Sequence, residues 1–302
     1  MEDETVEGRP RIYPDDQVTE PAVAGPGGTP INRRVLRLES ALLAVLAIAG
    51  AVIEYPLALA LKSLDRSELA RALPFLGVTI VLAALIPLAL RLNGVLGLPG
   101  APLIAAKIAG GRLHFSLRSL LRVSFGYAIL AALAGASVLA LLIVPLLLIH
   151  GVPTFKFPKT PMLTVTPGRI AITGALVGIV AAVSEEIQFR FVLYAILGWI
   201  ARLMSRDSRG HPGRLALWIV TLAQGYAFGL VHLAPLAGTL FHSTSRLLLG
   251  GLVMPQTWEG VVFGRLYLRR GLEASIIAHA SMDAALFALA ALGMLGTHLG
   301  AG

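Results

Sequence analysis

The chain has 302 residues, of which 56% are hydrophobic and only 14% are charged, and its mean hydropathy is +0.78. Because an ordinary soluble domain has about 25% charged residues, this composition excludes a soluble globular protein and predicts an all-α, polytopic membrane protein. The net charge of +8 does not predict nucleic-acid binding, since the basic residues form short clusters between apolar runs. The chain contains no cysteine, which excludes disulfides and thiolate metal sites.

The N-terminal segment, residues 1–34, differs from the rest of the chain in composition. It carries acidic residues together with Pro and Gly throughout, and it has no apolar core. A secretory signal peptide needs a basic start followed by about 7 to 15 apolar residues, so we expect none here. The composition is typical of a disordered tail, and we expect the membrane-embedded helical domain to cover residues 35–302.

Apolar stretches long enough to cross a bilayer, about 20 residues each, follow this tail. The sequence predicts seven of them, at 35–61, 69–90, 123–149, 170–200, 215–232, 247–268 and 273–296. An eighth membrane helix results if the segment 233–245 re-enters the bilayer. The fourth stretch has about 31 residues and would be about 46 Å long as one helix, so it must tilt, protrude or break.

The distribution of Lys and Arg predicts how the helices are oriented. With the N-terminus on the cytoplasmic side, the inner segments hold fifteen basic residues and the outer segments hold seven. The positive-inside rule therefore favours a cytoplasmic N-terminus and a C-terminus outside. The segment 93–121 is rich in Gly and basic residues, which is typical of an inner loop or an interfacial helix.

Three groups of polar residues lie inside the apolar stretches, where ionised groups are costly and usually functional. The first group contains Glu185, Glu186 and Arg190 in the fourth stretch. On an α-helix Glu186 and Arg190 lie four residues and about 40° apart and can pair, whereas Glu185 lies about 140° from Arg190. The spacing therefore predicts one ion pair and one free carboxylate in a sheltered place. An ion pair that only fixes helix packing is the structural alternative.

The other two groups each place two side chains four residues apart, on one face of a helix. Phe228 and His232 lie in the fifth stretch, and His279 and Asp283 lie in the seventh. Counted from the connection between the fourth and fifth stretches, Glu185 and His232 reach similar depths in the membrane, so we expect contact between them. The same count leaves His279 shallower by about 13 Å, so unequal helix ends or tilt must close that gap.

A carboxylate and two imidazoles that meet within the membrane can hydrolyse a bond in two ways. In the first, His232, His279 and Glu185 hold a zinc-like ion that acidifies a water molecule. In the second, Glu185 accepts a proton from water with the help of His232, while His279 stabilises the oxyanion. The sequence allows both. The structural alternatives are an interhelical hydrogen bond for His232 and a local one between His279 and Asp283.

These motifs also resemble a known family. Glu-Glu-x-x-x-Arg, Phe-x-x-x-His and His-x-x-x-Asn/Asp in successive membrane helices are similar to the motifs of the CPBP (Abi) family of intramembrane endopeptidases. That family includes the type II CAAX prenyl endopeptidases and bacteriocin-processing or immunity proteins. The resemblance covers about residues 165–297, and the run 264–271 before the last motif also resembles the family.

The resemblance implies a role for each motif residue. Four residues would form the catalytic site: Glu185, His232, His279 and Asp283. Three would support it structurally: Glu186, Arg190 and Phe228. The chain departs from the family at Phe191, where Gly is frequent, and at Asp283, where Asn is common. An amide can donate a hydrogen bond to an oxyanion but an ionised carboxylate cannot, so Asp283 must be protonated, orient His279 or bind a metal.

The sequence therefore predicts an intramembrane endopeptidase of the bacterial plasma membrane that cuts a membrane-associated peptide or lipidated protein. The CAAX branch of the family implies a prenylated substrate, and zinc is the cofactor to be tested. One alternative is a proton-coupled transporter, because intramembrane Glu, Arg and His also form proton relays; we find no internal repeat to support it. Another is a catalytically silent bacteriocin-immunity or scaffold protein. The sequence does not predict an oligomeric state.

Three further glutamates lie in or near the apolar stretches. Glu39 and Glu54 flank the first stretch and are expected at the membrane interface. Glu259 in the sixth stretch either lines the cavity or extends to the interface, and we assign it no catalytic role.

Overall fold

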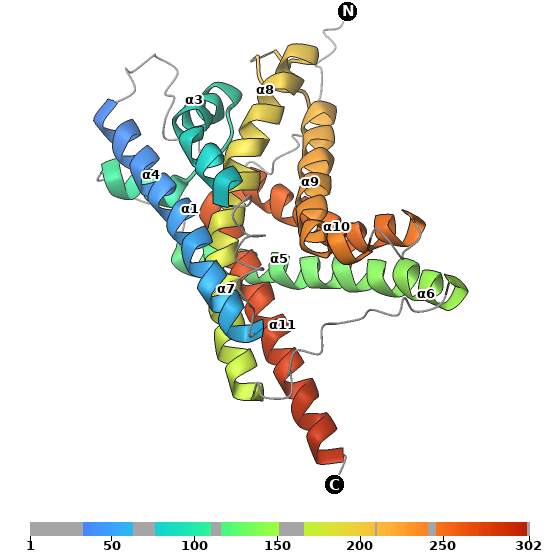
Figure 1. Ribbon diagram of the computed structural model, residues 1–302. Coiled ribbons are helices and arrows are strands. Elements are labelled where there is room, and N and C mark those ends of the chain that lie inside the picture. The colour runs from blue at the N-terminus through green and yellow to red at the C-terminus, as the bar shows by residue number, and fades with distance from the viewer. Residues whose placement is uncertain are drawn as a thin grey trace, which may run out of the picture.

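The structure, a computed structural model, describes residues 33–62, 76–109, 116–150, 166–208, 210–240 and 246–300. All named elements in these ranges are helices, as predicted for an all-α membrane protein. In chain order they are α1 (Arg33–Lys62), α3 (Ile86–Leu96), α4 (Pro102–Ala109), α5 (Leu117–Val138), η1 (Leu139–Ile143), α6 (Val144–His150), α7 (Pro167–Glu186), η3 (Ile187–Leu193), α8 (Tyr194–Met204), α9 (Arg214–Leu240), α10 (Arg246–Arg270) and α11 (Leu272–Gly300) (Figure 1). The tail predicted over residues 1–34 lies outside the described residues except for its last two.

Five helical segments among the described residues are long and apolar enough to cross a membrane: Arg34–Ile53, Leu117–Leu142, Pro167–Met204, Arg214–His232 and Leu272–Met294. The helix Leu76–Ala84 and α3, bent by 54° at their junction, make a sixth if they act as one broken span. The predicted count of seven or eight is therefore not confirmed. The difference concerns α10, expected to span at 247–268, which is less apolar and carries Glu259 and Arg265 in its second half.

The fourth predicted stretch forms one continuous helical segment, Pro167–Met204, made of α7, η3 and α8. It begins at a cap in which the Thr166 side chain accepts a backbone N–H, followed by Pro167, whose missing N–H costs nothing at this position. Of the predicted tilt, protrusion or break, the described residues show no break, but a π-helical turn, η3, interrupts the α-helix directly after Glu186. Such turns are rare and often accompany functional sites.

The helices α8 and α9 form the antiparallel hairpin that the sequence predicts. They lie side by side at the top of Figure 1, and a β-bridge between Arg206 and Pro212 closes the turn between them. The first part of the segment expected to re-enter the membrane, 233–240, continues α9, and residues 241–245 lie outside the described part of the chain. A re-entrant helix at 233–245 is therefore not seen as a separate element in the described residues.

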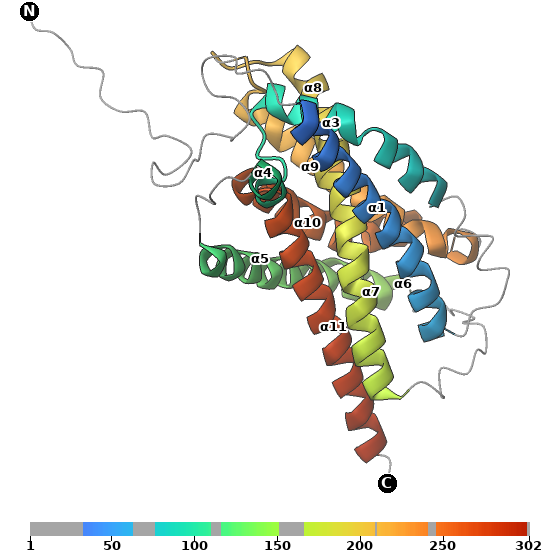
Figure 2. The same cartoon turned by 90° about the vertical axis from the view of Figure 1, so that its left-hand side faces the viewer.

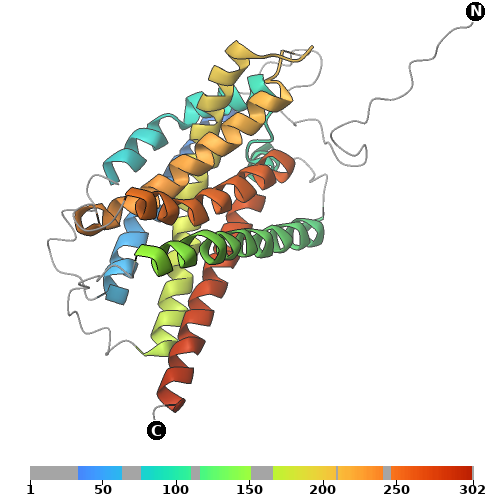
Figure 3. The same ribbon diagram turned by 90° about the vertical axis from the view of Figure 1, so that its right-hand side faces the viewer.

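The helices α7 and α11 run side by side through the middle of the molecule (Figure 2). Gly174 and Gly178 of α7 allow this close approach, because a Cβ atom at either position would overlap with the side chain of Phe287 or Asp283 on α11. Small residues at such contacts are typical of membrane helices. The helices α5 and α10 lie beside each other and cross this pair (Figure 3). The crossing places α7, α9, α10 and α11 around one region.

Large apolar side chains are exposed over much of the described surface, among them Leu141, Leu148, Ile149 and Met204. A surface of this kind would promote aggregation in water but matches the hydrocarbon of a bilayer. Together with the five spanning segments, it identifies an integral membrane protein. The cytoplasmic N-terminus and the bacterial plasma membrane stay predictions.

Candidate active site

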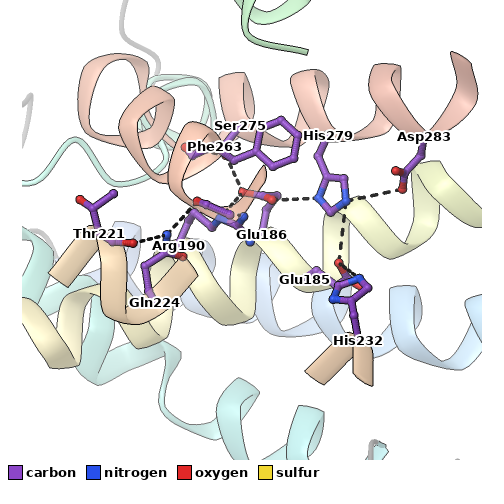
Figure 4. Close-up of polar contacts among 11 residues, drawn as sticks. Glu185, Glu186, Arg190, Thr221, Gln224, His232, Phe263, Ser275, His279 and Asp283 are labelled. Atoms are coloured by element: carbon purple, nitrogen blue, oxygen red, sulfur yellow. Dashed lines mark hydrogen bonds and ion pairs between the residues drawn. The ribbon is translucent and has the colours of Figure 1, made fainter. Parts of the chain in front are cut away.

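The carboxylate of Glu186 is fully buried and makes contacts with three residues (Figure 4). Its Oε2 lies 3.2 Å from Arg190 Nε, which confirms the ion pair predicted from their spacing. The Ser275 hydroxyl donates to the same oxygen, and His279 Nδ1 lies 2.9 Å from Oε1. A buried charge is tolerated when it is paired and hydrogen-bonded, and Glu186 meets this condition.

Arg190, also fully buried, extends this contact to two more helices. Its guanidinium lies 4.3 Å from the ring centroid of Phe228 on α9, within cation–π distance. Its Nη2 donates to the Gly260 carbonyl oxygen on α10 at 3.4 Å. Gln224 of α9 donates to the same oxygen at 2.8 Å. The Glu186–Arg190 pair therefore joins α7, α9, α10 and α11 in one buried network.

Glu185 points away from this network, as its position on the helix predicts. Its Oε2 lies 3.9 Å from His232 Nε2 and 3.8 Å from His279 Nε2, and it has no hydrogen-bond partner. The side chain retains 21% exposure. These separations are too long for direct hydrogen bonds but suit a small molecule held between the three groups. The structure thus brings together the carboxylate and the two imidazoles that the sequence singles out.

The hydrogen bonds at Nδ1 fix which nitrogen of each histidine faces Glu185. His232 Nδ1 lies 2.8 Å from the carbonyl oxygen of Phe228. Because a carbonyl oxygen only accepts, this nitrogen must carry the hydrogen. His279 Nδ1 donates in the same way to the ionised carboxylate of Glu186. The Nε2 atom of each ring therefore faces Glu185.

Asp283 lies one helical turn beyond His279 on α11, as predicted. Its Oδ2 is 3.5 Å from His279 Nε2, and the side chain retains 20% exposure. The Nε2 atom of His279 therefore faces two carboxyl groups, those of Asp283 and Glu185. Gly178 on α7 leaves room for the Asp283 side chain, since a Cβ atom there would overlap with it.

Aromatic rings hold the two histidines in place. Phe228 lies 4.5 Å from the His232 ring and 5.7 Å from the His279 ring, measured between centroids. Phe263 of α10 stacks on His279 at 4.9 Å with an interplanar angle of 22°. Offset and edge contacts of this kind contribute about 0.5 to 1.5 kcal/mol each. Packing thus limits how far either imidazole can rotate.

Ser275 and Phe263 contact Glu186 and His279 directly and were not predicted from the sequence. Ser275 lies four residues before His279, and this spacing places both on one face of α11, so it could have been found. Phe263 carries no comparable signal, because its contact with His279 depends on how α10 packs against α11.

The mismatch of about 13 Å expected for His279 arises from a wrong assumption about the turns. The expected depths were counted in residues from the α8–α9 and α10–α11 turns, as if both turns lay at the same depth in the membrane. In Figures 1 and 3 the α10–α11 turn lies lower than the α8–α9 turn. The backbone explains this position, because Gly271 adopts φ +87° and Leu272 N donates to the Gly100 carbonyl oxygen at 2.8 Å. The turn is thereby fixed beside the α3–α4 connection.

The predicted zinc ligands can be compared with this geometry. No group of three His, Cys, Asp or Glu side chains that could hold a metal ion occurs in the described ranges. A zinc ion held by His232, His279 and Glu185 stays a prediction.

Comparison with known proteins agrees with the motifs. Residues 167–285 match the family model described as Type II CAAX prenyl endopeptidase Rce1-like. This range contains all seven motif residues, from Glu185 to Asp283. No curated protein and no solved structure matches the chain. The predicted resemblance is confirmed over these residues, and it supports an endopeptidase of the CAAX type in general.

Proposed function

Starting from the match of residues 167–285 to the type II CAAX prenyl endopeptidases, we propose that the chain hydrolyses a peptide bond within the membrane, with water activated at Glu185. The observation that carries the proposal is the unpartnered Glu185 Oε2, which faces the Nε2 atoms of His232 and His279 at 3.9 and 3.8 Å. An unpaired polar atom in a membrane protein is costly, and a reacting water would satisfy it.

The proposed reaction begins with water between Glu185 and His232. Glu185 accepts a proton from the water while His232 Nε2 helps to orient it. The water oxygen bonds to the carbonyl carbon of the peptide, and negative charge moves to the carbonyl oxygen. The C–N bond then breaks, and the proton held by Glu185 passes to the leaving nitrogen. The products are a carboxylic acid and an amine.

His279 is the proposed donor to the developing oxyanion. Because its Nδ1 already donates to Glu186, His279 donates through Nε2 only as an imidazolium, in which both ring nitrogens donate. Asp283, 3.5 Å from the same Nε2, orients the ring. Glu186 and Arg190 are positioning residues, because they hold His279 and Phe228 without facing the proposed water.

The substrate class rests on the family resemblance. The proposed substrate is a membrane-associated peptide or lipidated protein, and the CAAX branch favours a prenylated one. The exposed fractions of Glu185 and His232, 21% and 35%, leave access for a peptide from outside the helix bundle.

The first experiment measures turnover of a membrane peptide library that includes prenylated CAAX peptides. Wild-type protein is compared with Glu185→Gln and His232→Ala, and with Glu39→Gln as a control that removes a carboxylate from α1. Cleavage that is lost in the first two variants and kept in the control supports the proposal. If correctly folded wild-type protein cleaves nothing, or all variants cleave equally, the endopeptidase proposal fails and proton flux is the next assay.

The same assay tests the predicted zinc requirement. A chelator is added to wild-type protein, followed by zinc. The proposed glutamate mechanism predicts activity that resists the chelator. Loss of activity that zinc restores would instead support a metal held by His232, His279 and Glu185, and the metal-free glutamate mechanism would be abandoned.

A further inference from the structure

One face of α10 borders the proposed site and carries polar residues that the mechanism does not use. Gln256, Glu259 and Phe263 are spaced by three and four residues, which places them on one side of the helix. Phe263 stacks on His279, so this side of α10 faces the site. Gln256 and Glu259 continue the same side away from His279.

The carboxyl group of Glu259 is half-buried and has no hydrogen-bond or ion-pair partner among the described residues. Its Oε1 lies against α5 at Gly135, where a Cβ atom would be only 2.6 Å away. It interacts electrostatically with His279, Asp283 and Arg190. The Oε1 atom of Gln256, one turn earlier, is buried and also lacks a partner. Two unsatisfied acceptors therefore lie near the site on one helix.

The charges around the site are unequal in number. Four carboxyl groups belong to this region: Glu185, Glu186, Asp283 and Glu259. Two cationic groups face them: the Arg190 guanidinium, which is already paired with Glu186, and the His279 imidazolium of the proposed mechanism. In a low-dielectric setting a cation brought close to these groups gains attraction and an anion meets repulsion.

We propose that Glu259 and Gln256 form a subsite for a basic side chain of the substrate, Lys or Arg, close to the bond that is cut. The long apolar stem of such a side chain packs along α10 while its charged head reaches Glu259. The Gln256 carbonyl oxygen accepts a second N–H from the same head. Glu259 is then a specificity-determining residue, and this role rests on the proposed endopeptidase function.

The test uses three sets of membrane peptides that carry Lys, norleucine or Glu in turn at each position within three residues of the cleaved bond. Norleucine matches the stem of Lys without its charge. Wild-type protein is expected to cleave the Lys peptide with a kcat/KM about tenfold above that of the norleucine peptide at one position, and to cleave the Glu peptide least. Glu259→Gln is expected to bring the Lys-to-norleucine ratio close to one, and Glu259→Lys to favour the Glu peptide.

Two results would overturn the subsite. One is a wild-type enzyme that cleaves all three peptides equally at every position, and the other is a Glu259→Gln variant that keeps the wild-type ratio. Glu39→Gln serves as the control that must keep the ratio. If wild-type protein cleaves no peptide, the endopeptidase proposal fails, and the subsite is tested by binding of labelled peptides instead. Tighter binding of Lys than norleucine to Glu185→Gln protein, lost in Glu185→Gln/Glu259→Gln, upholds the subsite, and equal binding rejects it.

Discussion

Glu185 and Glu186 are neighbours in the sequence, yet they lie in opposite environments. Glu186 is fully buried and has contacts with Arg190, Ser275 and His279. Glu185 is partly exposed, and its Oε2 has no hydrogen-bond partner although two imidazoles lie within 4 Å. The Glu186 carboxylate therefore joins neighbouring helices, whereas the Glu185 carboxylate is available to a molecule that enters the site.

Removing the Glu185 carboxylate is expected to have the largest effect of all, and that effect is on turnover. Glu185→Gln removes the proposed proton acceptor but keeps the size of the side chain, so we expect turnover to fall by about 10²- to 10⁴-fold. The unfolding temperature should change little, because Glu185 Oε2 makes no hydrogen bond that the variant would lose. Single-turnover peptide cleavage and thermal unfolding measure the two effects. A Glu185→Gln variant that is active would remove Glu185 from the mechanism.

Removing the Glu186 carboxylate should lower the stability of the fold, in contrast to the effect expected at Glu185. Glu186→Ala leaves Arg190 buried without its counter-ion, which is expected to cost about 3 to 5 kcal/mol of unfolding free energy. The measurement is denaturant-induced unfolding in detergent micelles. The double variant Glu186→Gln/Arg190→Met removes both charges and should recover part of the loss. If Glu186→Ala unfolds like wild-type protein, the buried network does not stabilise the fold.

Local spacing predicted much of this arrangement. The pairing of Glu186 with Arg190 and the separate direction of Glu185 follow from helix geometry, and both are present even though a π-helical turn begins at Ile187. The facing of His232 and Glu185 follows from counting residues along a hairpin. These features depend on neighbours within one helix or across one short turn.

Features that depend on packing between distant helices could not be predicted in this way. His279 follows the α10–α11 turn, where Leu272 N donates to the carbonyl oxygen of Gly100, a residue far away in the sequence. The predicted number of membrane spans is not confirmed, because α10 is less apolar than the five spanning segments of the described residues. The stacking of Phe263 on His279 also requires the crossing of α10 and α11.

Ser275 donates to Glu186, which in turn contacts the His279 ring of the proposed site. Replacing Ser275 should have a smaller effect than replacing Glu186. Ser275→Ala removes a hydrogen bond to a charged carboxylate, and we expect a loss of about 1.5 to 3 kcal/mol in unfolding free energy. Because Glu186 then holds His279 less firmly, kcat should fall while KM changes little. Ser275→Thr retains the hydroxyl group and should recover most of kcat. Equal stability and equal kcat in Ser275→Ala would show that the hydroxyl does not position Glu186.

The smallest expected effect on kcat/KM is that of replacing Asp283 by Asn. The Oδ2 atom of Asp283 lies 3.5 Å from His279 Nε2. The family that the chain resembles commonly has Asn at this position. An amide oxygen can accept a hydrogen bond from the His279 ring and orient it as a carboxylate does. We therefore expect Asp283→Asn to change kcat/KM by less than about tenfold, or 1.4 kcal/mol, whereas Asp283→Ala should lower it further because the ring loses its partner. Cleavage of one peptide by both variants over a range of pH values is the measurement. A loss in Asp283→Asn as large as that in Glu185→Gln would show that the charge of Asp283, and not its hydrogen bond, takes part in the reaction.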